Sequence, residues 1–182
     1  MPRSCEYERD AVLTAAMEAF RRGGYGAVSI RTLEEATGLK AGSIYNSFDD
    51  KDGLFRAAFA HYVECVLKAR IAEHAPSEAG LGGLRMLFTS LMHEPDDGVL
   101  GCLITNSAVE FGGKDTPPAA VHVALEILAN LFRQRLSARA SVKLLALYQG
   151  ILVLVRAGWD KAALEAMVNT EFDQLEGKTY DA

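Results

Sequence analysis

The sequence predicts an all-α fold with nine helices, in one or two small domains. Helix-forming residues are abundant along the 182-residue chain, and apolar residues recur at helical spacing in most segments. No stretch alternates apolar and polar residues convincingly enough to predict a strand. Residues 28–55 add a third observation, because two short helical segments are joined there by a glycine turn and followed at once by a third helix. This is a helix-turn-helix pattern.

The charge of the chain is unevenly spread. Apolar residues make up 49% of the sequence and charged residues 24%, which is ordinary for a soluble globular protein. The net charge of −5 argues against non-specific binding to nucleic acid. Residues 1–70 nevertheless hold ten basic and ten acidic residues, whereas residues 71–182 hold nine basic and fourteen acidic residues. DNA therefore repels the amino-terminal part less than the remainder.

The chain is expected to begin with a short arm and one helix. Residues 1–6 are expected to form a loose arm from which Arg3 could reach a DNA groove, although a disordered terminus is the more common case. Over residues 8–22, apolar side chains mark one stripe of a helix. A pair of glycines ends that helix. Tyr25 follows, either as a phosphate contact or as a ring that fills the core of the small domain.

The helix-turn-helix pattern has recognisable local signals. Ser29 is a good N-cap, since its hydroxyl can accept from the free N–H groups of the first helical turn. Gly38 can adopt the left-handed conformation that a sharp helix exit requires. The second helix, over residues 41–46, is too short to be stable alone. It is expected to form because Ile44 and Phe48 hold it against the first helix.

The surface of this second short helix supports a role in binding DNA. Its first turn is made of small residues, so its backbone can approach another molecule closely. Its hydroxyl and amide groups suit phosphate oxygens and base edges. Asp49 or Asp50 can cap the next helix, which has Lys51 in its first turn. A cation there is unfavourable because the helix dipole is positive at this end. A phosphate bound at the helix end would resolve this conflict, since both the helix N-terminus and the lysine attract anions. The candidates for DNA contact are Ala41, Gly42, Ser43, Tyr45, Asn46 and Lys51.

The rest of the chain is predicted to be helical but carries fewer specific signals. A long helix is expected over residues 52–74, followed by a break over residues 76–83. Residues 141–157 are apolar almost all round, so this helix must be buried on several sides. A small domain gives it too little cover, which predicts a homodimer. The other helices are expected at residues 84–93, 100–111, 116–137 and 160–176.

Several aromatic, glycine and lysine positions match a known family in order and spacing. They are Phe20, Gly24, Tyr25, Gly38, Tyr45, Phe48, Lys51 and Leu54. Over residues 8–60 the sequence resembles the DNA-binding domain of the TetR family of bacterial repressors. Two positions depart from the family pattern: Lys40 stands where a capping Ser or Thr is usual, and Asn46 where a longer or more basic side chain is frequent. The segment GCLITNSAVEF, residues 101–111, also resembles a motif from one branch of the family.

The resemblance implies a two-domain regulator. Residues 1–50 would be the helix-turn-helix domain and residues 51–182 the domain for ligand binding and dimerisation, with the long helix as the lever between them. The dimer is expected to form through residues 141–157 and 160–176, and to set two recognition helices about 34 Å apart on a palindromic operator. The family pattern adds three residues to the DNA contacts, Ser29, Arg31 and Thr32.

Members of this family usually release DNA when a small molecule enters the carboxy-terminal domain, so the resemblance implies a ligand-responsive repressor. The expected pocket is mainly apolar with a few polar groups. Its candidate residues are Tyr62, Phe88, Met92, Cys102, Asn106, Glu110, Tyr148 and Gln149. A sharper alternative makes Cys102 itself a redox or electrophile sensor, because a helix N-terminus raises the thiolate fraction. A buried cysteine that packs like alanine is the more common case.

Other function classes are less well supported. The four histidines are scattered, and the sequence has neither a glycine-rich phosphate loop nor a G-x-S-x-G elbow, so no enzyme, cofactor or metal site is expected. A helical scaffold without DNA binding is disfavoured by Tyr45 and Lys51.

Three cysteines at no metal-like spacing favour reduced thiols in the cytoplasm. The charged first twenty residues do not resemble a signal peptide, and the apolar run over residues 144–155 is too short to span a bilayer.

Overall fold

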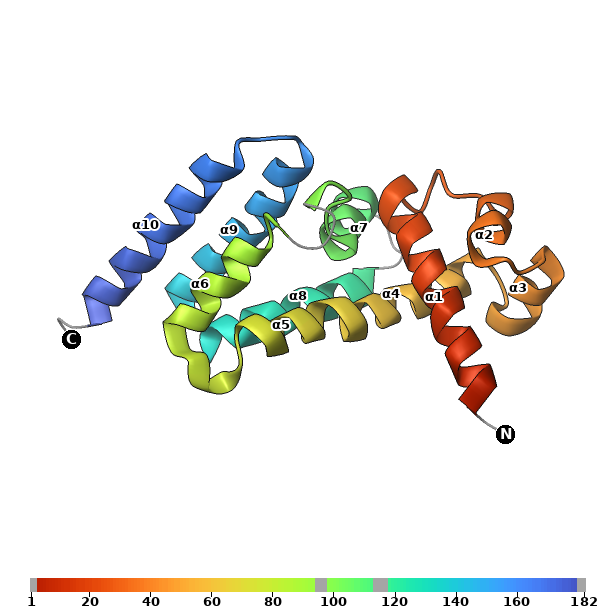
Figure 1. Ribbon diagram of the computed structural model, residues 1–182, viewed down its shortest axis with the longest axis horizontal. Coiled ribbons are helices and arrows are strands. Elements are labelled where there is room, and N and C mark those ends of the chain that lie inside the picture. Colours follow the sequence, from red (N-terminus) through yellow and green to blue (C-terminus); the bar gives the residue numbers. More distant parts are fainter. Residues whose placement is uncertain (1–2, 94–97, 113–117, 180–182) are drawn as a thin grey trace. The chain divides into compact units, whose positions relative to one another are not determined.

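The computed structural model describes residues 3–93, 98–112 and 118–179 (Figure 1). Within these ranges every regular element is a helix and no strand occurs, which confirms the predicted all-α fold. Because α4, η1 and α5 follow one another without a gap, these ranges contain nine separate helices and one 3₁₀ turn. The elements are α1 (Arg3–Gly23), α2 (Ile30–Thr37), α3 (Ala41–Phe48), α4 (Lys51–Tyr62), the π-helix η1 (Val63–Lys68), α5 (Ala69–His74), the 3₁₀ turn η2 (Ser77–Ala79), α6 (Gly80–Ser90), α7 (Leu103–Phe111), α8 (Pro118–Arg133), α9 (Ala138–Arg156) and α10 (Lys161–Thr179).

Several helix boundaries differ from the prediction; among them, α8 ends at Arg133 and α9 begins at Ala138, each earlier than expected. α1 begins at Arg3, so the segment expected to be a loose arm is helical from that residue onward, and residues 3–22 contain neither glycine nor proline to stop a helix. α6 begins at Gly80 and ends at Ser90, earlier at both ends than expected. α7 begins after Cys102, which is extended with φ −100° and ψ 131°. The loop over residues 94–97, and the part of the expected 116–137 helix that precedes α8, lie outside the described residues.

The chain folds into two compact units. Unit 1 comprises Met1–Leu67 and Cys102–Ala124, and unit 2 comprises Lys68–Gly101 and Leu125–Ala182. This division follows backbone packing, and it places α7 with the helix-turn-helix. The functional boundary expected between residues 50 and 51 stays a prediction.

Aromatic rings form the core of unit 1. The Phe20 ring on α1 meets the Phe55 ring on α4 edge to face, with their centroids 5.0 Å apart. The rings of Tyr25, from the α1–α2 loop, and Phe111, from α7, complete the cluster with a centroid distance of 5.2 Å. Such pairs contribute about 0.5–1.5 kcal/mol each beyond the apolar area that they bury. The cluster therefore holds α1, α4, α7 and the loop that leads into the helix-turn-helix together.

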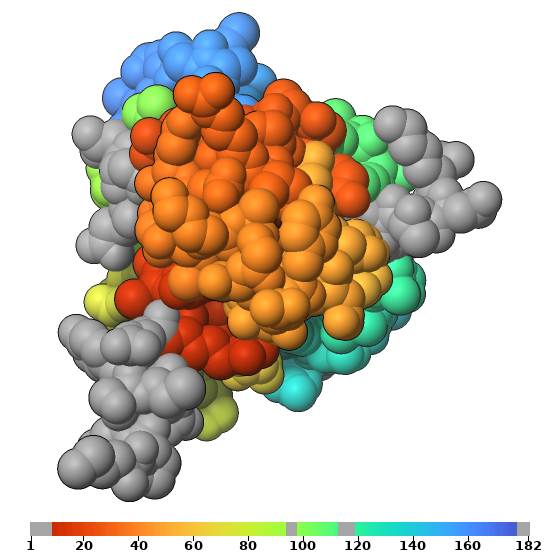
Figure 2. Space-filling model, turned by 90° about the vertical axis from the view of Figure 1, so that its right-hand side faces the viewer, coloured from red at the N-terminus to blue at the C-terminus, as the bar shows by residue number. Residues whose placement is uncertain are grey.

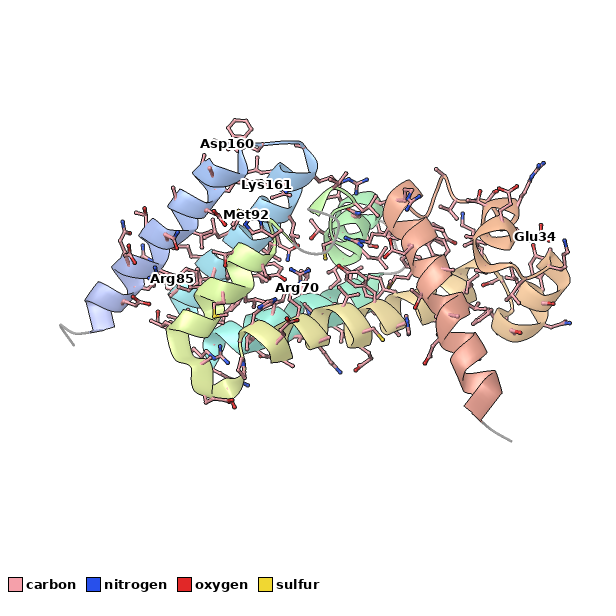
Figure 3. All side chains as sticks on the ribbon, viewed as in Figure 1. Glu34, Arg70, Arg85, Met92, Asp160 and Lys161 are labelled. Atoms are coloured by element: carbon pink, nitrogen blue, oxygen red, sulfur yellow. The ribbon has the colours of Figure 1, made fainter. Side chains whose placement is uncertain are left out.

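Unit 2 has its own aromatic core, bordered by ion pairs. Phe88 on α6 packs edge to face against Tyr148 on α9 and Phe172 on α10, at centroid distances of 5.4 and 5.3 Å. Arg85, which is labelled in Figure 3, pairs with Asp173 at 2.6 Å and so connects α6 to α10. Because Asp173 is exposed, solvent weakens this ion pair, and the aromatic packing contributes more to the stability of the unit.

α9 is apolar but only partly buried in one copy of the chain. Its mean hydropathy is 1.5 over an 18-residue window, of which 33% is buried. Val142 and Val153 are 70% and 48% exposed, so one copy of the chain covers this helix only in part, and its burial on several sides stays a prediction. The apolar run over residues 144–155 is expected to be too short to span a bilayer. The whole helix, residues 138–156, is nevertheless long and apolar enough to do so by length and composition alone. That criterion is weak, because the core helix of a globular protein also meets it.

Candidate nucleic-acid interface

The first helix of the helix-turn-helix is capped at both ends as its sequence predicts. The Ser29 hydroxyl accepts a hydrogen bond from the backbone N–H of Thr32 at 3.1 Å. Gly38 has φ +73°, and its N–H donates to the backbone carbonyl of Glu34 at 2.9 Å. A larger residue would be strained in this left-handed conformation, so the sharp exit from α2 depends on glycine.

The start of α3 is capped by a side chain from α2. Lys40 occupies the N-cap position and makes no side-chain hydrogen bond there. The backbone N–H of Ala41 instead donates to the carboxylate of Glu34 at 2.7 Å. Figure 3 labels Glu34 between the two helices. A carboxylate at this position satisfies a free N–H group and complements the helix dipole, so Glu34 compensates for the missing Ser or Thr.

α3 buries its apolar side chains and exposes its polar ones. Ile44 is fully buried and Phe48 is 7% exposed, which confirms that these two residues anchor the short helix. Figure 2 looks onto the α2–α3 surface, drawn in orange. A presented helix with small and hydrogen-bonding groups on its free face suits a DNA groove. The exposed predicted contacts on α3 are Gly42, Ser43, Tyr45 and Asn46.

Lys51, at the start of α4, is held by an aromatic ring. Its Nζ lies 4.3 Å from the centroid of the Tyr25 ring, which is a cation–π distance. Burial raises the pKa of Tyr25, and the carboxylates of Asp52 and Asp50 raise it further. Tyr25 is therefore a neutral, half-buried ring that positions Lys51. Asp50, one of the two expected caps, accepts a hydrogen bond from the N–H of Gly53 at 2.7 Å.

The predicted contacts on α2 are engaged in local interactions. The Nε of Arg31 lies 3.1 Å from a carboxylate oxygen of Glu35, and both side chains are largely exposed. The hydroxyls of Thr32 and Ser29 share a hydrogen bond of 2.9 Å. An exposed ion pair contributes at most about 1 kcal/mol. Arg31 can therefore exchange its carboxylate partner for a phosphate readily.

A carboxylate from α7 fixes the loop between α1 and α2. The backbone N–H groups of Tyr25 and Gly26 donate to the two carboxylate oxygens of Glu110, at 2.8 and 2.6 Å. One turn earlier on α7, the Asn106 amide donates to the backbone carbonyl of Arg21 at 3.2 Å. The sequence predicts Asn106 and Glu110 as pocket residues and carries no signal of this role. The partners are about 85 residues apart along the chain, so no local pattern connects them.

The other residues expected in a ligand pocket are mostly buried. In unit 2, Phe88 and Tyr148 meet in the aromatic core, with their ring centroids 5.4 Å apart. Cys102 is 8% exposed, at the N-cap position of α7 in unit 1. Tyr62 and Met92 are buried as well, and Gln149 is half-buried. Their part in ligand binding stays a prediction.

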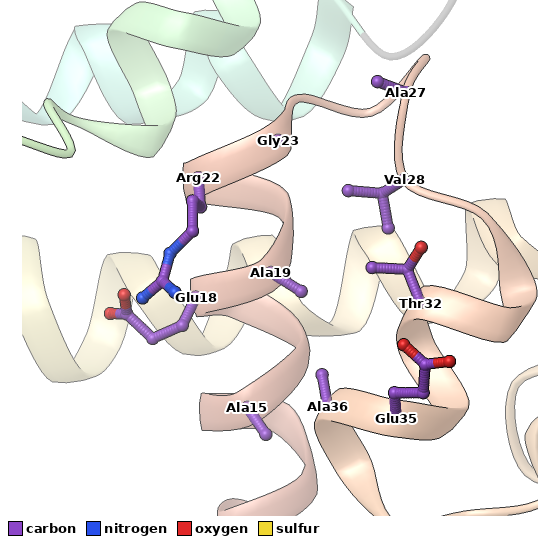
Figure 4. Close-up of a pocket in the computed structure, with 10 residues that line it drawn as sticks. All are labelled: Ala15, Glu18, Ala19, Arg22, Gly23, Ala27, Val28, Thr32, Glu35 and Ala36. Carbon is purple, nitrogen blue, oxygen red and sulfur yellow. The ribbon is translucent and has the colours of Figure 1, made fainter.

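A cavity of about 580 Å³ opens between α1 and α2, and its lining residues are drawn in Figure 4. The cavity exists because small apolar side chains on both helices do not fill the space between them, and charged side chains lie at its border. No pattern in the sequence predicts the cavity, because it depends on how far apart two helices pack. The lining residues are Ala15, Glu18, Ala19, Arg22, Gly23, Ala27, Val28, Thr32, Glu35 and Ala36.

Comparison with known proteins finds relatives that share the helix-turn-helix region of this chain. The family model described as bacterial regulatory proteins, tetR family, matches residues 12–58, which include all of α2 and α3. Over these residues the chain resembles the TetR family. The TetR-type domain is similar to that of the transcriptional repressor ComR of Escherichia coli (strain K12), with 47% identity over 58 residues, which are 32% of this chain and 28% of ComR.

Two further relatives of this chain are repressors named AcnR. The AcnR protein of Corynebacterium glutamicum is 43% identical over 49 residues, which are 27% of this chain and 26% of that protein. The matches to ComR and to this AcnR thus span less than a third of the length of either relative. The AcnR protein of Corynebacterium diphtheriae is 27% identical over 71% of this chain and 80% of its own length.

Solved structures extend the likeness of fold to nearly the whole of this chain. A TetR transcriptional regulator from Chloroflexus aurantiacus has a TM-score of 0.82 over 96% of both chains, at 24% identity. A cysteine mutant of the TetR-family regulator CifR, complexed with a 26-bp double-strand operator DNA, has a TM-score of 0.77 at 26% identity, over 91% of this chain and 95% of that one. The fold is therefore that of an amino-terminal helix-turn-helix followed by a helical carboxy-terminal domain.

Proposed function

We propose that this protein is a DNA-binding transcriptional regulator that represses its target genes. The observation that carries the proposal is the exposed polar face of α3, anchored by the buried Ile44 and Phe48. The names of ComR and AcnR as transcriptional repressors support it, as does the operator DNA bound by CifR. Such a regulator needs no catalytic group or cofactor, so we assign it no enzymatic activity. It acts in the cytoplasm, where its operator is accessible.

Base contacts and phosphate contacts fall to different residues in this proposal. Ser43 and Asn46 reach base edges from α3, and an asparagine amide can bond both N6 and N7 of an adenine. Tyr45 and Lys51 hold phosphates, because hydroxyl and ammonium donors to the backbone set the register of a protein on the duplex. The remaining contacts come from the N-cap residue Ser29, from Arg31 and Thr32 on α2, and from the small residues Ala41 and Gly42 on α3.

Binding selection followed by titration tests this function. A random 26-bp duplex pool should yield a palindromic sequence, and fluorescence anisotropy should show a steep loss of affinity for it with salt. Lys51→Ala should weaken binding to all duplexes about equally and reduce the salt slope by about one unit. Lys68→Ala, which removes an exposed lysine from the end of η1, serves as the matched control. If no sequence is enriched from the pool, the proposal fails.

The protein acts as a homodimer through α9 and α10. Val142 and Val153 form an exposed apolar stripe on α9 that a second copy can cover. Lys143 on α9 pairs with Glu171 on α10 at 2.6 Å, which holds the two helices of one copy together. Two such pairs form a four-helix interface with twofold symmetry. On α10, close approach of a second copy is allowed by the exposed small residues Ala162, Ala163 and Ala166.

A charge placed in this interface tests the dimer. Val153→Glu should convert the dimer to a monomer in sedimentation at micromolar concentration, because the carboxylate would be buried without a partner. Val109→Glu is the matched control, since Val109 on α7 is 76% exposed and lies outside α9 and α10. If the wild-type protein sediments as a monomer at this concentration, the proposed homodimer is wrong.

A small-molecule effector controls DNA binding in this proposal. It can release DNA by favouring a conformation in which the two recognition helices are wrongly spaced. The domain over residues 51–182 supplies its pocket. The alternative sensor, the thiol of Cys102, is 8% exposed, and this burial supports a packing role for it instead.

A further inference from the structure

A cysteine, a histidine and a threonine form an exposed cluster in unit 1 that the proposed DNA contacts do not use. Cys65 lies on the π-helix η1 and is exposed. His61, four residues earlier on α4, places its Nδ1 3.6 Å from the Sγ of Cys65. The other ring nitrogen, Nε2, lies 2.8 Å from the hydroxyl of Thr14 on α1. The imidazole therefore bridges a thiol and a hydroxyl.

This arrangement has the three parts of an activated nucleophile. A nucleophile lies within reach of a base, and a third group orients that base. When the Thr14 hydroxyl accepts from Nε2–H, the lone pair of Nδ1 faces the thiol and can take its proton. The helix geometry adds an independent sign, because π-helical turns are rare and occur frequently at functional sites. The cluster thus has a chemistry that neither the aromatic core nor the α3 surface requires.

We propose that Cys65 is a site of covalent modification by α,β-unsaturated carbonyl compounds, with His61 as the base and Thr14 as a positioning residue. As the sulfur bonds to the β-carbon, the thiol proton passes to Nδ1 of His61. The electron pair of the C=C bond shifts to give an enolate, and the proton held by His61 returns to the α-carbon. This addition balances without an oxidant. A disulfide would need a second accessible thiol, and Cys102, the other cysteine whose side chain the structure describes, is buried.

Site-resolved alkylation kinetics test the proposal on the full chain. The probe is a limiting amount of N-ethylmaleimide, and peptide mass spectrometry gives a rate for each cysteine, relative to N-acetylcysteine in the same buffer. Cys65 should react at least about tenfold faster in the folded protein than in urea, because a positioned base accelerates proton transfer by tenfold or more. Cys102 should react faster in urea than in the folded state. If Cys65 reacts equally fast or more slowly when folded, mere exposure explains it and the proposal is wrong.

Two variants separate the base from a structural role. His61→Gln should lower the folded-state rate of Cys65 about tenfold and remove the histidine step from the pH–rate profile. Thr14→Val, which keeps the side-chain shape, should lower the rate by a smaller factor. Thr170→Val is the matched control, because the Thr170 hydroxyl bonds only within α10 at 2.9 Å to Ala166. Wild-type rates in both the His61 and Thr14 variants, with helix content preserved by circular dichroism, would overturn the role of His61.

Discussion

Glu110→Gln should loosen the entrance to the helix-turn-helix. The Glu110 carboxylate accepts hydrogen bonds from the backbone N–H groups of Tyr25 and Gly26, at 2.8 and 2.6 Å. Glutamine has nearly the same shape but offers only one acceptor oxygen, so one N–H would lose its partner. The loop over residues 24–28 should then open more often, and the position of α2 should become less well defined.

The size of this effect follows from the two contacts. A hydrogen bond to a charged group contributes about 1.5–3 kcal/mol. The Gly26 contact is exposed to solvent, so water replaces part of the loss there. We therefore expect Glu110→Gln to reduce the free energy of unfolding by about 1–2 kcal/mol. For a chain of this size, that change corresponds to a decrease in Tm of about 3–6 °C.

Hydrogen exchange and thermal unfolding measure the two consequences. In Glu110→Gln the amides of residues 24–28 should exchange about tenfold faster, because about 1.4 kcal/mol changes an opening equilibrium tenfold. Glu126→Gln is the matched control, since Glu126 pairs with Arg133 at 2.9 Å on the exposed surface of α8. If both variants show the same exchange and the same Tm, the carboxylate does not hold the loop and the reasoning is refuted.

Two further predictions concern charges near the interface. Glu35→Gln frees Arg31 from its 3.1 Å ion pair and makes the guanidinium available to a phosphate. In anisotropy titrations, the affinity for DNA should therefore rise about two- to fivefold at low salt and change little at high salt. An unchanged affinity at low salt would count against Arg31 as a DNA contact. Because burial raises the pKa of Tyr25, the unfolded chain loses this proton first as the pH rises, so the stability that neutral Tyr25 contributes is present below about pH 10 and is lost above it. The wild type should therefore lose more urea resistance above pH 10 than Tyr25→Phe does, and equal losses would contradict this assignment.

Much of the helix-turn-helix could be predicted because its signals are local. Ser29 and Gly38 act on backbone groups within four residues of themselves, and the structure shows both contacts. Ile44 and Phe48 follow helical periodicity, and both are buried. Residue type and spacing within one or two turns determine such features, so they can be read from the sequence without knowledge of the tertiary structure.

The contacts that support the interface depend instead on tertiary structure. Glu34 caps α3 only because the turn folds α2 back onto it, and Glu110 reaches the α1–α2 loop from a helix about 85 residues away. The partial exposure of α9 is a similar case. An apolar sequence indicates that a helix needs cover, but it does not say whether the cover comes from the same copy or from another. The π-helical turn at Cys65 likewise has no sequence signature.

The central claim is that the exposed face of α3 reads DNA sequence, and Asn46→Ala tests it most directly. Fluorescence anisotropy should compare the selected duplex with a shuffled duplex of the same composition, for the wild type and for this variant. A side chain that bonds a base edge contributes about 1–3 kcal/mol of discrimination, so the ratio of the two affinities should fall by about tenfold or more while binding to the shuffled duplex barely changes. An unchanged ratio, or an equal loss on both duplexes, would show that Asn46 does not contact a base and would contradict the claim.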